Sequence, residues 1–375
     1  MIIMALDHTR DYFHRYSYFY NPADLSHTSP AIFFTRWITH FCAPVFVFIA
    51  GTSAFLSGQK KTRKDLSVFL VKRGLWLMVL EITLVSFGWF FNPLFSLWAL
   101  QVIWVLGVCM IVLAALIHLP QKLIFIIGMA LVFGHNLLDG VHVPGNTAAS
   151  FAWSELHEFN VFNFHHIIIL AAYPAIPWVG VMALGYCFGN IYLPAFDTAK
   201  RKRLLLLMGS LGIVLFILLR FINVYGDPSG WSPHSPAVFS FLSFLNVSKY
   251  PPSLLYLLMT LSPAFLFLAF AEKAPARMAG IVSTYGRVPL FYYLLHIYVL
   301  HFLAMLLAAL TGFGWKEMVI TQTWVTDDPA LRGYGLSLPM VYLIWLIIVI
   351  ALYPLCKKYD RYKQNNRSKW WLSYL

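Results

Sequence analysis

Long apolar runs, separated by short polar segments, dominate the pattern of the chain. A run of about 20 apolar residues matches the hydrocarbon thickness of a bilayer, so each run predicts a membrane-spanning helix. The predicted spans cover residues 1–20, 31–58, 66–91, 97–118, 121–138, 165–191, 203–223, 250–271, 279–308 and 335–356. A transmembrane β-barrel would instead show segments of about ten residues with alternating hydrophobicity. We therefore predict an all-α fold, a polytopic membrane helical bundle of about ten helices.

Positive charge is concentrated in alternate connections between these runs. Lys and Arg gather between the second and third spans, and again in every second connection after that, up to the tail that follows the tenth span. Cytoplasmic loops carry the excess of Lys and Arg in membrane proteins, so we expect these connections and both termini to be cytoplasmic. The formal net charge of +12 is then a topology signal, and we expect no nucleic-acid partner.

The composition points to the lipid bilayer as a partner of the chain. Of its 375 residues, 60% are hydrophobic and 11% are charged, whereas an ordinary soluble domain has about 25% charged residues. The sequence contains no recognisable soluble domain and no strong repeat, so we expect a single integral-membrane domain over residues 1–375. Its helices are expected to extend to residue 356, and residues 357–375 to form a basic cytoplasmic tail. The cysteines are scattered singly and predict neither a disulfide framework nor a zinc site: Cys42, Cys109, Cys187 and Cys356.

Five ionisable side chains interrupt the first apolar run, MIIMALDHTRDYFH. They are Asp7, His8, Arg10, Asp11 and His14. An ionised Asp or Arg at the centre of a membrane helix costs roughly 2.5–3.5 kcal/mol on insertion scales, so these groups need partners, water or a function. On a helix, four of them share an arc of about 100°, and His8 lies about 60° beyond it. All five can therefore face a common interior cavity.

Two interpretations of this segment remain open. An Asp beside a His favours general-base catalysis, because the carboxylate fixes the imidazole tautomer and stabilises the imidazolium that forms. In the structural interpretation, Asp7 pairs with Arg10, and Asp11 with His14, at a helix end.

Further polar residues in or beside the apolar runs predict a polar cavity that binds substrate. In the second span, Arg36 and His40 are spaced i and i+4, and Arg36 can either neutralise an Asp of the first span or bind an anionic group. The small residues that follow, from Gly51 to Ala54, indicate close helix packing. The predicted cavity residues are Arg36, His40, Gln101, His135, Asp139, His165, His166 and His296. His165 and His166 are expected to open the sixth span, at the end of a polar connection over 139–164 that forms either a substrate vestibule or an ordinary solvated loop.

Several segments together resemble a known family. They are MIIMALDHTRDYFH, FFTRWITHFCAPVFVFIAGTSAFLSG, LVKRGLWLMVLEITLVSFGWFF, QVIWVLGVCMIVLAALI and GHNLLDG. They are similar to the bacterial branch of the heparan-α-glucosaminide N-acetyltransferase catalytic-domain family, within the wider membrane acyltransferase superfamily. The similarity covers about the first 190 residues, and the stretch STYGRVPLFYYLLHIYVLH more loosely.

The resemblance implies a multi-pass enzyme of the bacterial cytoplasmic membrane. It would move an acetyl group from cytoplasmic acetyl-CoA to an amine or hydroxyl of a glycan or small amino-sugar acceptor on the exoplasmic side. His8 matches the essential histidine of the superfamily, with Asp7, Asp11 and His14 in support, while His14 or His27 could replace it. Arg36, His40 or Gln101 could donate to the oxyanion, and Lys72, Arg73 and Arg287 could bind the phosphates of CoA. No metal or haem is expected, and a homo-oligomer is compatible with the sequence.

A proton-coupled transporter is the main alternative. It would use the same polar cavity, with Asp7, Asp11 and His14 as a proton relay. Transporters often consist of two repeated halves, and the sequence shows no such duplication. A haem-bearing redox protein is a third class, but the chain contains no C-x-x-C-H motif.

Overall fold

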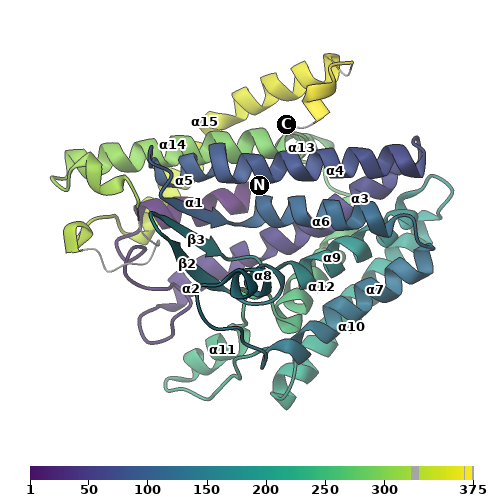
Figure 1. Ribbon diagram of the computed structural model, residues 1–375, viewed down its shortest axis with the longest axis horizontal. Helices are drawn as coiled ribbons and strands as arrows, with labels where there is room; N and C mark the ends of the chain where they lie inside the picture. The colour runs from purple at the N-terminus through teal and green to yellow at the C-terminus, as the bar shows by residue number, and fades with distance from the viewer. Residues whose placement is uncertain (322–328, 367, 374–375) are drawn as a thin grey trace. The chain divides into compact units, whose positions relative to one another are not determined.

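The structure, a computed structural model, describes residues 1–321, 329–366 and 368–373 and is mainly helical (Figure 1). The chain divides into two compact units. The first unit comprises Met1–Cys42, Thr83–Trp98 and Ala274–Leu375, and the second comprises Ala43–Ile82 and Ala99–Lys273.

The first unit is built around the short helix α1 (Ile2–Phe13), which contacts the next helix along the chain and two helices near its C-terminal end. These are α2 (Pro30–Trp37), α14 (Pro289–Leu310) and α15 (Leu338–Asn365). The indole N–H of Trp345 donates to the Ile2 carbonyl at 2.9 Å and fixes α1 against α15. Ser29 caps the N-terminus of α2, and Pro30 occupies its first turn. The other elements of this unit are η1 (Ile38–Phe41), α5 (Ser86–Phe90), α13 (Ala276–Arg287), η5 (Trp315–Met318), η6 (Pro329–Leu331) and η7 (Trp370–Ser373).

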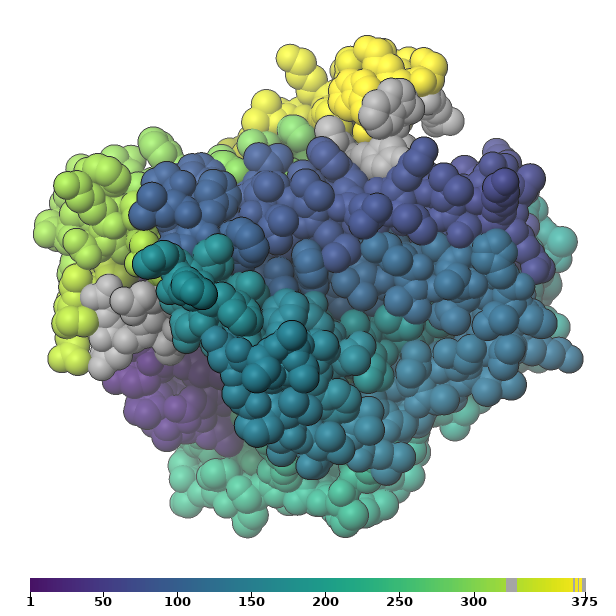
Figure 2. Space-filling model, viewed as in Figure 1, coloured from purple at the N-terminus to yellow at the C-terminus, as the bar shows by residue number. Residues whose placement is uncertain are grey.

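The second unit contains the remaining helices and a small sheet. Four of its helices pack in a series: α4 (Arg63–Leu80) on α6 (Val102–Leu116), α6 on α9 (Ala175–Phe188), and α9 on α7 (Gln121–Gly134). The blue-coloured part of this series is visible in the space-filling view (Figure 2). The other helical elements are α3 (Cys42–Gly58), η3 (His135–Leu138), α8 (Ala148–Leu156), η4 (Gly189–Tyr192), α10 (Thr198–Ile222), α11 (Ala237–Leu245) and α12 (Leu254–Ala271). One turn of π-helix, η2 (Glu81–Val85), connects α4 to α5 along the chain.

The sheet corrects the prediction of an entirely helical fold. Strand β2 (Asn160–Phe164) pairs antiparallel with β3 (Ile167–Ala171), in the strand order β1-β3-β2, where β1 is Leu97–Leu100. Two predicted spans, 97–118 and 165–191, therefore begin as strands. His165 and His166 do not open a helix, because Phe164 pairs with Ile167 and leaves them exposed in the turn between β2 and β3.

The helices confirm a multi-pass helical membrane protein. Within the described residues, seven helical segments are long and apolar enough to cross a bilayer. They are Pro30–Gly58, Gln121–Leu138, Ala175–Tyr192, Thr198–Ile222, Leu254–Ala271, Pro289–Leu310 and Leu338–Asn365, and Val102–Leu116 is a shorter apolar helix. The predicted first span contributes only the 12 residues of α1. The predicted span 279–308 is divided between α13 and α14, because Pro289 starts a new helix. Ten spans and cytoplasmic termini stay predictions.

Candidate functional site

The charged residues of α1 form an ion-pair network with α2 inside the first unit. The two carboxylate oxygens of Asp7 accept from different guanidinium groups: Oδ1 from Arg10 Nη2 at 2.9 Å, and Oδ2 from Arg36 Nη1. Arg10 also pairs with Asp11. Asp7 and Arg10 are buried, and a buried charge is tolerated only when it is paired and hydrogen-bonded. The Asp7–Arg10 pair and the contact of Arg36 with Asp7 agree with the sequence expectations, whereas Asp11, expected to pair with His14, pairs with Arg10.

His8 lies on another side of α1 and contacts a second histidine. Its Nδ1 atom is 2.7 Å from Nε2 of His296 on α14, and the two ring planes are nearly parallel, 11° apart, with their centroids 5.0 Å apart. The indole of Trp89, on α5, packs edge-on against the His8 ring at 4.7 Å. The Trp89 N–H in turn donates to the Tyr293 hydroxyl at 3.1 Å. His8 is thus held by aromatic side chains of α5 and α14.

The hydrogen bonds around His296 fix the tautomers of both rings. Nδ1 of His296 lies 2.7 Å from the carbonyl oxygen of Tyr292, which can only accept, so this nitrogen carries a hydrogen. In the neutral ring, Nε2 of His296 is then an acceptor, and the hydrogen of the contact with His8 sits on Nδ1 of His8. Neutral His8 therefore carries its lone pair on Nε2. A lone pair on an oriented imidazole nitrogen is what a general base requires.

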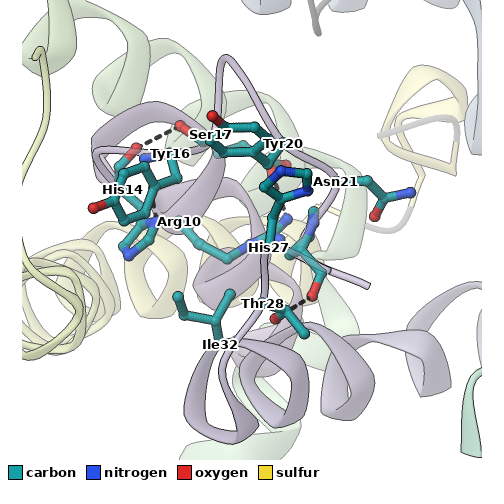
Figure 3. A pocket seen from close by; sticks show the side chains of 11 residues that line it. Arg10, His14, Tyr16, Ser17, Tyr20, Asn21, His27, Thr28 and Ile32 are labelled. Carbon is teal, nitrogen blue, oxygen red and sulfur yellow. Dashed lines mark hydrogen bonds and ion pairs between the residues drawn. The ribbon is translucent and has the colours of Figure 1, made fainter. Parts of the chain in front are cut away.

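A small pocket opens at the C-terminal end of α1 (Figure 3). Arg10, Asp11 and His14 contribute to its lining from the α1 segment, and Tyr20 and His27 from the loop that follows. Its free volume of about 20 Å³ has room for one water-sized group. Asp7 and His8 are not among the residues that line this pocket: Asp7 binds Arg36, and His8 contacts His296.

His27, in this pocket, is paired with a carboxylate. Nδ1 of His27 lies 2.8 Å from Oδ2 of Asp24, and its ring stacks on Tyr20 with centroids 4.2 Å apart, as Figure 3 shows for the two rings. Hydrogen bonds from His27 and Ser26 lower the pKa of Asp24 to about 2. Asp24 was not selected from the sequence, although its Asp-x-x-His spacing with His27 is a usable signal. Trp89 was also missed, and a tryptophan in an apolar run gives no such signal.

Several predicted cavity residues belong to the second unit and form networks there. The ring nitrogens of His135 face the carbonyl oxygens of Pro252, at 2.9 Å, and of Leu131 and Val132, at 3.0 Å. Asp139 accepts from Asn136 at 2.8 Å and contacts Nε2 of His157 at 3.2 Å. Gln101 precedes α6, and its backbone N–H donates to the buried carboxylate of Glu81 at 3.1 Å.

The predicted phosphate-binding residues are distributed over both units. Lys72 and Arg73 lie on α4 of the second unit, Lys72 exposed and Arg73 half-buried. Arg287, at the end of α13 in the first unit, makes a bidentate pair with Asp360, with contacts from 2.7 to 3.0 Å. His40 is buried in η1 of the first unit. Across the described part of the chain, no group of three or more His, Cys, Asp or Glu side chains is arranged to hold a metal ion.

Comparison with known families identifies one match. Residues 1–219 match the family model described as heparan-alpha-glucosaminide N-acetyltransferase, catalytic. The matched range covers more than half of the chain and includes α1, α2 and the pocket at the end of α1, whereas His296 lies beyond it. Neither the curated proteins nor the solved structures contain a match to the chain.

Proposed function

The chain belongs to the heparan-α-glucosaminide N-acetyltransferase catalytic family, and from this we propose that it transfers an acetyl group from acetyl-CoA to an amine or hydroxyl of a sugar-like acceptor. The family supports membrane acetyl transfer and gives the transporter alternative no support. In the proposed topology, acetyl-CoA enters from the cytoplasm, and the acceptor binds on the exoplasmic side of a bacterial inner membrane. Whether the product is an amide or an ester depends on the acceptor atom.

We propose His8 as the general base, and the contact between His8 and His296 is the observation that carries this proposal. The acceptor nitrogen or oxygen bonds to the thioester carbonyl carbon while its proton passes to Nε2 of His8. The tetrahedral intermediate then collapses, the carbon–sulfur bond breaks, and the CoA sulfur leaves and takes up the proton from His8. A positioned base of this kind contributes about 10²–10⁴-fold to the rate.

The ion pairs of α1 lie next to the proposed base in the chain. Arg36 and Arg10 neutralise the carboxylate of Asp7, the residue that precedes His8. Asp11 and His14 line the pocket and would contact the acceptor. His40 or Gln101 would donate to the oxyanion, and Lys72, Arg73 and Arg287 would bind the CoA phosphates. For Arg287, the phosphate would compete with Asp360 for Nε and Nη2.

The test is acetyl transfer by the purified full chain in lipid nanodiscs. Acetyl-CoA is supplied with a panel of amino sugars and hydroxylated sugars, and the release of free CoA is measured for the wild type and for three variants: His8→Gln, His27→Gln and, as a control, His118→Gln. His118 is exposed in the second unit. We expect His8→Gln to lower kcat by about 10²–10⁴-fold and His118→Gln to leave it unchanged.

Two outcomes would overturn parts of the proposal. If His8→Gln kept its activity while His27→Gln lost it, the base would be His27, oriented by Asp24. If the wild type released no CoA with any acceptor, but vesicles that contain it accumulated a solute in response to a proton gradient without a thioester, the transporter would replace the acetyltransferase.

A further inference from the structure

A second cavity lies in the first unit, beside the pocket at the end of α1. It holds about 850 Å³ and is lined by Arg15, Tyr16, Phe19, Tyr20, Arg332, Gly333 and Gly335. Binding sites for small molecules usually have about 300–1,000 Å³, so this cavity is large enough for a sugar-sized ligand. We call it the two-arginine cavity.

The two cavities share a wall. Tyr16 and Tyr20 line both of them. The pocket with Asp11, His14 and His27 has room only for one water-sized group, about 20 Å³. A single hydroxyl or amine fits such a space, but the ring that carries it does not. An acceptor that places one polar group in the small pocket must therefore keep its ring outside, and the two-arginine cavity is the adjoining space.

The chemistry of the two-arginine cavity selects for negative charge. Arg15 and Arg332 both line it, and the described residues of its lining include no carboxylate. The guanidinium group of Arg15 makes no hydrogen bond or ion pair to another described residue. Guanidinium groups bind phosphate and carboxylate in a bidentate manner, and three aromatic residues, Tyr16, Phe19 and Tyr20, add apolar surface that a sugar ring can contact.

Backbone hydrogen bonds hold Arg15 against the opposite wall. The N–H of Leu336 donates to the Phe13 carbonyl at 2.7 Å, and the N–H of Arg15 donates to the Leu336 carbonyl at 3.2 Å. Gly335, with φ +105°, makes this approach possible, because a Cβ atom there would lie 2.7 Å from the Cα and N atoms of Arg15. The site is thus built from two distant segments that are locked together.

We propose that the two-arginine cavity binds an oxyanion of the acceptor, a phosphate or a carboxylate, with the sugar ring against Tyr16 and Tyr20. The inference rests on the proposed acetyl transfer. It names the acceptor as an anionic sugar derivative, carried either by a soluble sugar or by the headgroup of a lipid.

The experiment compares charged and neutral acceptors in nanodiscs made of neutral lipid. Glucosamine 6-phosphate and glucosamine are the probes, and Arg15→Gln is compared with Arg361→Gln, an exposed arginine of α15 outside both cavities. We expect the wild type to prefer the phosphorylated sugar in kcat/KM, and we expect Arg15→Gln to reduce that preference at least tenfold. Arg15→Lys, which keeps the charge, should restore part of it. Arg361→Gln should keep the wild-type preference.

Equilibrium binding separates this inference from the proposed function. Titration calorimetry measures the affinity for glucosamine 6-phosphate, with inorganic phosphate as a competitor, without any turnover. If Arg15→Gln binds glucosamine 6-phosphate tenfold more weakly, the two-arginine cavity is supported as the oxyanion site even if no acetyl transfer is found. If Arg15→Gln weakens binding to phosphatidylglycerol vesicles but not to the soluble probes, a lipid headgroup is the source of the oxyanion. The inference would be overturned if the wild type, Arg15→Gln and Arg332→Gln had the same affinity for glucosamine 6-phosphate and the same preference for it over glucosamine.

Discussion

Nδ1 of His8 and Nε2 of His296 lie 2.7 Å apart, although 288 residues separate them in the chain. The contact joins α1 to α14 within the first unit, and the Tyr292 carbonyl at the far side of His296 sets the direction of both hydrogens. A histidine, rather than a carboxylate, therefore orients the proposed base. Because His296 is neutral when it accepts from His8, it fixes the tautomer without adding a second negative charge beside Asp7.

Replacement of His296 by leucine should reduce acetyl transfer without removing the base. His8 would lose the acceptor for its Nδ1–H, and we expect a loss of about 10–100-fold in kcat, the scale found for hydrogen-bond partners that orient metal-bound imidazoles. His296→Gln should recover most of the rate, because its amide oxygen can accept the same hydrogen bond. The measurement is kcat for CoA release by both variants, with thermal unfolding as a control for the fold. Equal losses in the two variants would show that His296 acts only through packing.

The network on α1 shows what the sequence can predict about the site. Asp7 and Arg36 both lie in apolar segments, and a buried carboxylate needs a cation, so their pairing follows from charge and burial alone. The partner of His8 does not follow, because α14 carries two histidines. His296 and His301 lie about 140° apart on the helix and both contact α1, and only tertiary packing determines that His296 meets His8 while His301 meets Tyr12.

For the fold, the long apolar helices could be predicted from the sequence, but a strand and the end of a helix could not. Apolar runs identified the helices that are long enough to cross a bilayer, because length and hydrophobicity suffice for that purpose. The strand β3 was missed because its sequence, IIILA, continues into the apolar helix α9, and a short apolar run does not distinguish a strand from a buried helix. The end of α1 at Phe13 was missed as well, since the following turns are rich in aromatic residues.

Asp7 and Arg36 should be energetically coupled. Removal of one partner from a buried ion pair usually costs about 3–5 kcal/mol. We expect about 2 kcal/mol for Arg36→Gln, because Arg10 still binds Asp7. The double variant Asp7→Asn/Arg36→Gln should lose less than the sum of the two single variants, as measured by unfolding in mixed micelles.

The pair between Arg201 and the half-exposed Glu272 is the control for this cycle. Glu272 is about half exposed, with its side chain at 53%, and such pairs contribute about 0–1 kcal/mol. Glu272→Gln should therefore shift the unfolding midpoint only slightly. Additive losses at Asp7 and Arg36 would mean that their contact contributes nothing of its own.

Arg220 should be irreplaceable by lysine. Its guanidinium donates to four carbonyl oxygens, those of Ser229, Ser243, Phe244 and Asn246, at 2.8 to 3.0 Å. A lysine ammonium cannot reproduce this planar set of donors, and buried carbonyls without a partner each cost about 1–3 kcal/mol. We expect Arg220→Lys to speed proteolytic cleavage of the segment 223–253. Arg203→Lys, exposed on the same helix, should be cleaved like the wild type, and a cleavage rate unchanged in Arg220→Lys would contradict this role.

Gly185 should tolerate no side chain, because α9 and α3 approach there through their backbones. A Cβ atom at Gly185 would lie 2.1 Å from the Phe48 carbonyl oxygen, and one at Gly51 would lie 2.1 Å from the carbonyl oxygen of Met182. The close approach also allows the Thr52 hydroxyl to donate to the Gly185 carbonyl at 3.0 Å. Small residues at membrane helix interfaces have this function in general, as the stretch after Gly51 predicts. An alanine would force the two helices apart, and overpacking of this kind costs about 1–3 kcal/mol.

The matched control for Gly185→Ala is Gly280→Ala on α13. Nothing lies within 4 Å of a Cβ atom at position 280. There alanine only removes the flexibility of glycine, which favours a helix by roughly 0.5–1 kcal/mol. Unfolding in mixed micelles should thus show a lower midpoint for Gly185→Ala and an equal or higher one for Gly280→Ala. If both variants unfolded at the wild-type midpoint, α3 and α9 would not be in backbone contact, and the small residues of α3 would need another explanation.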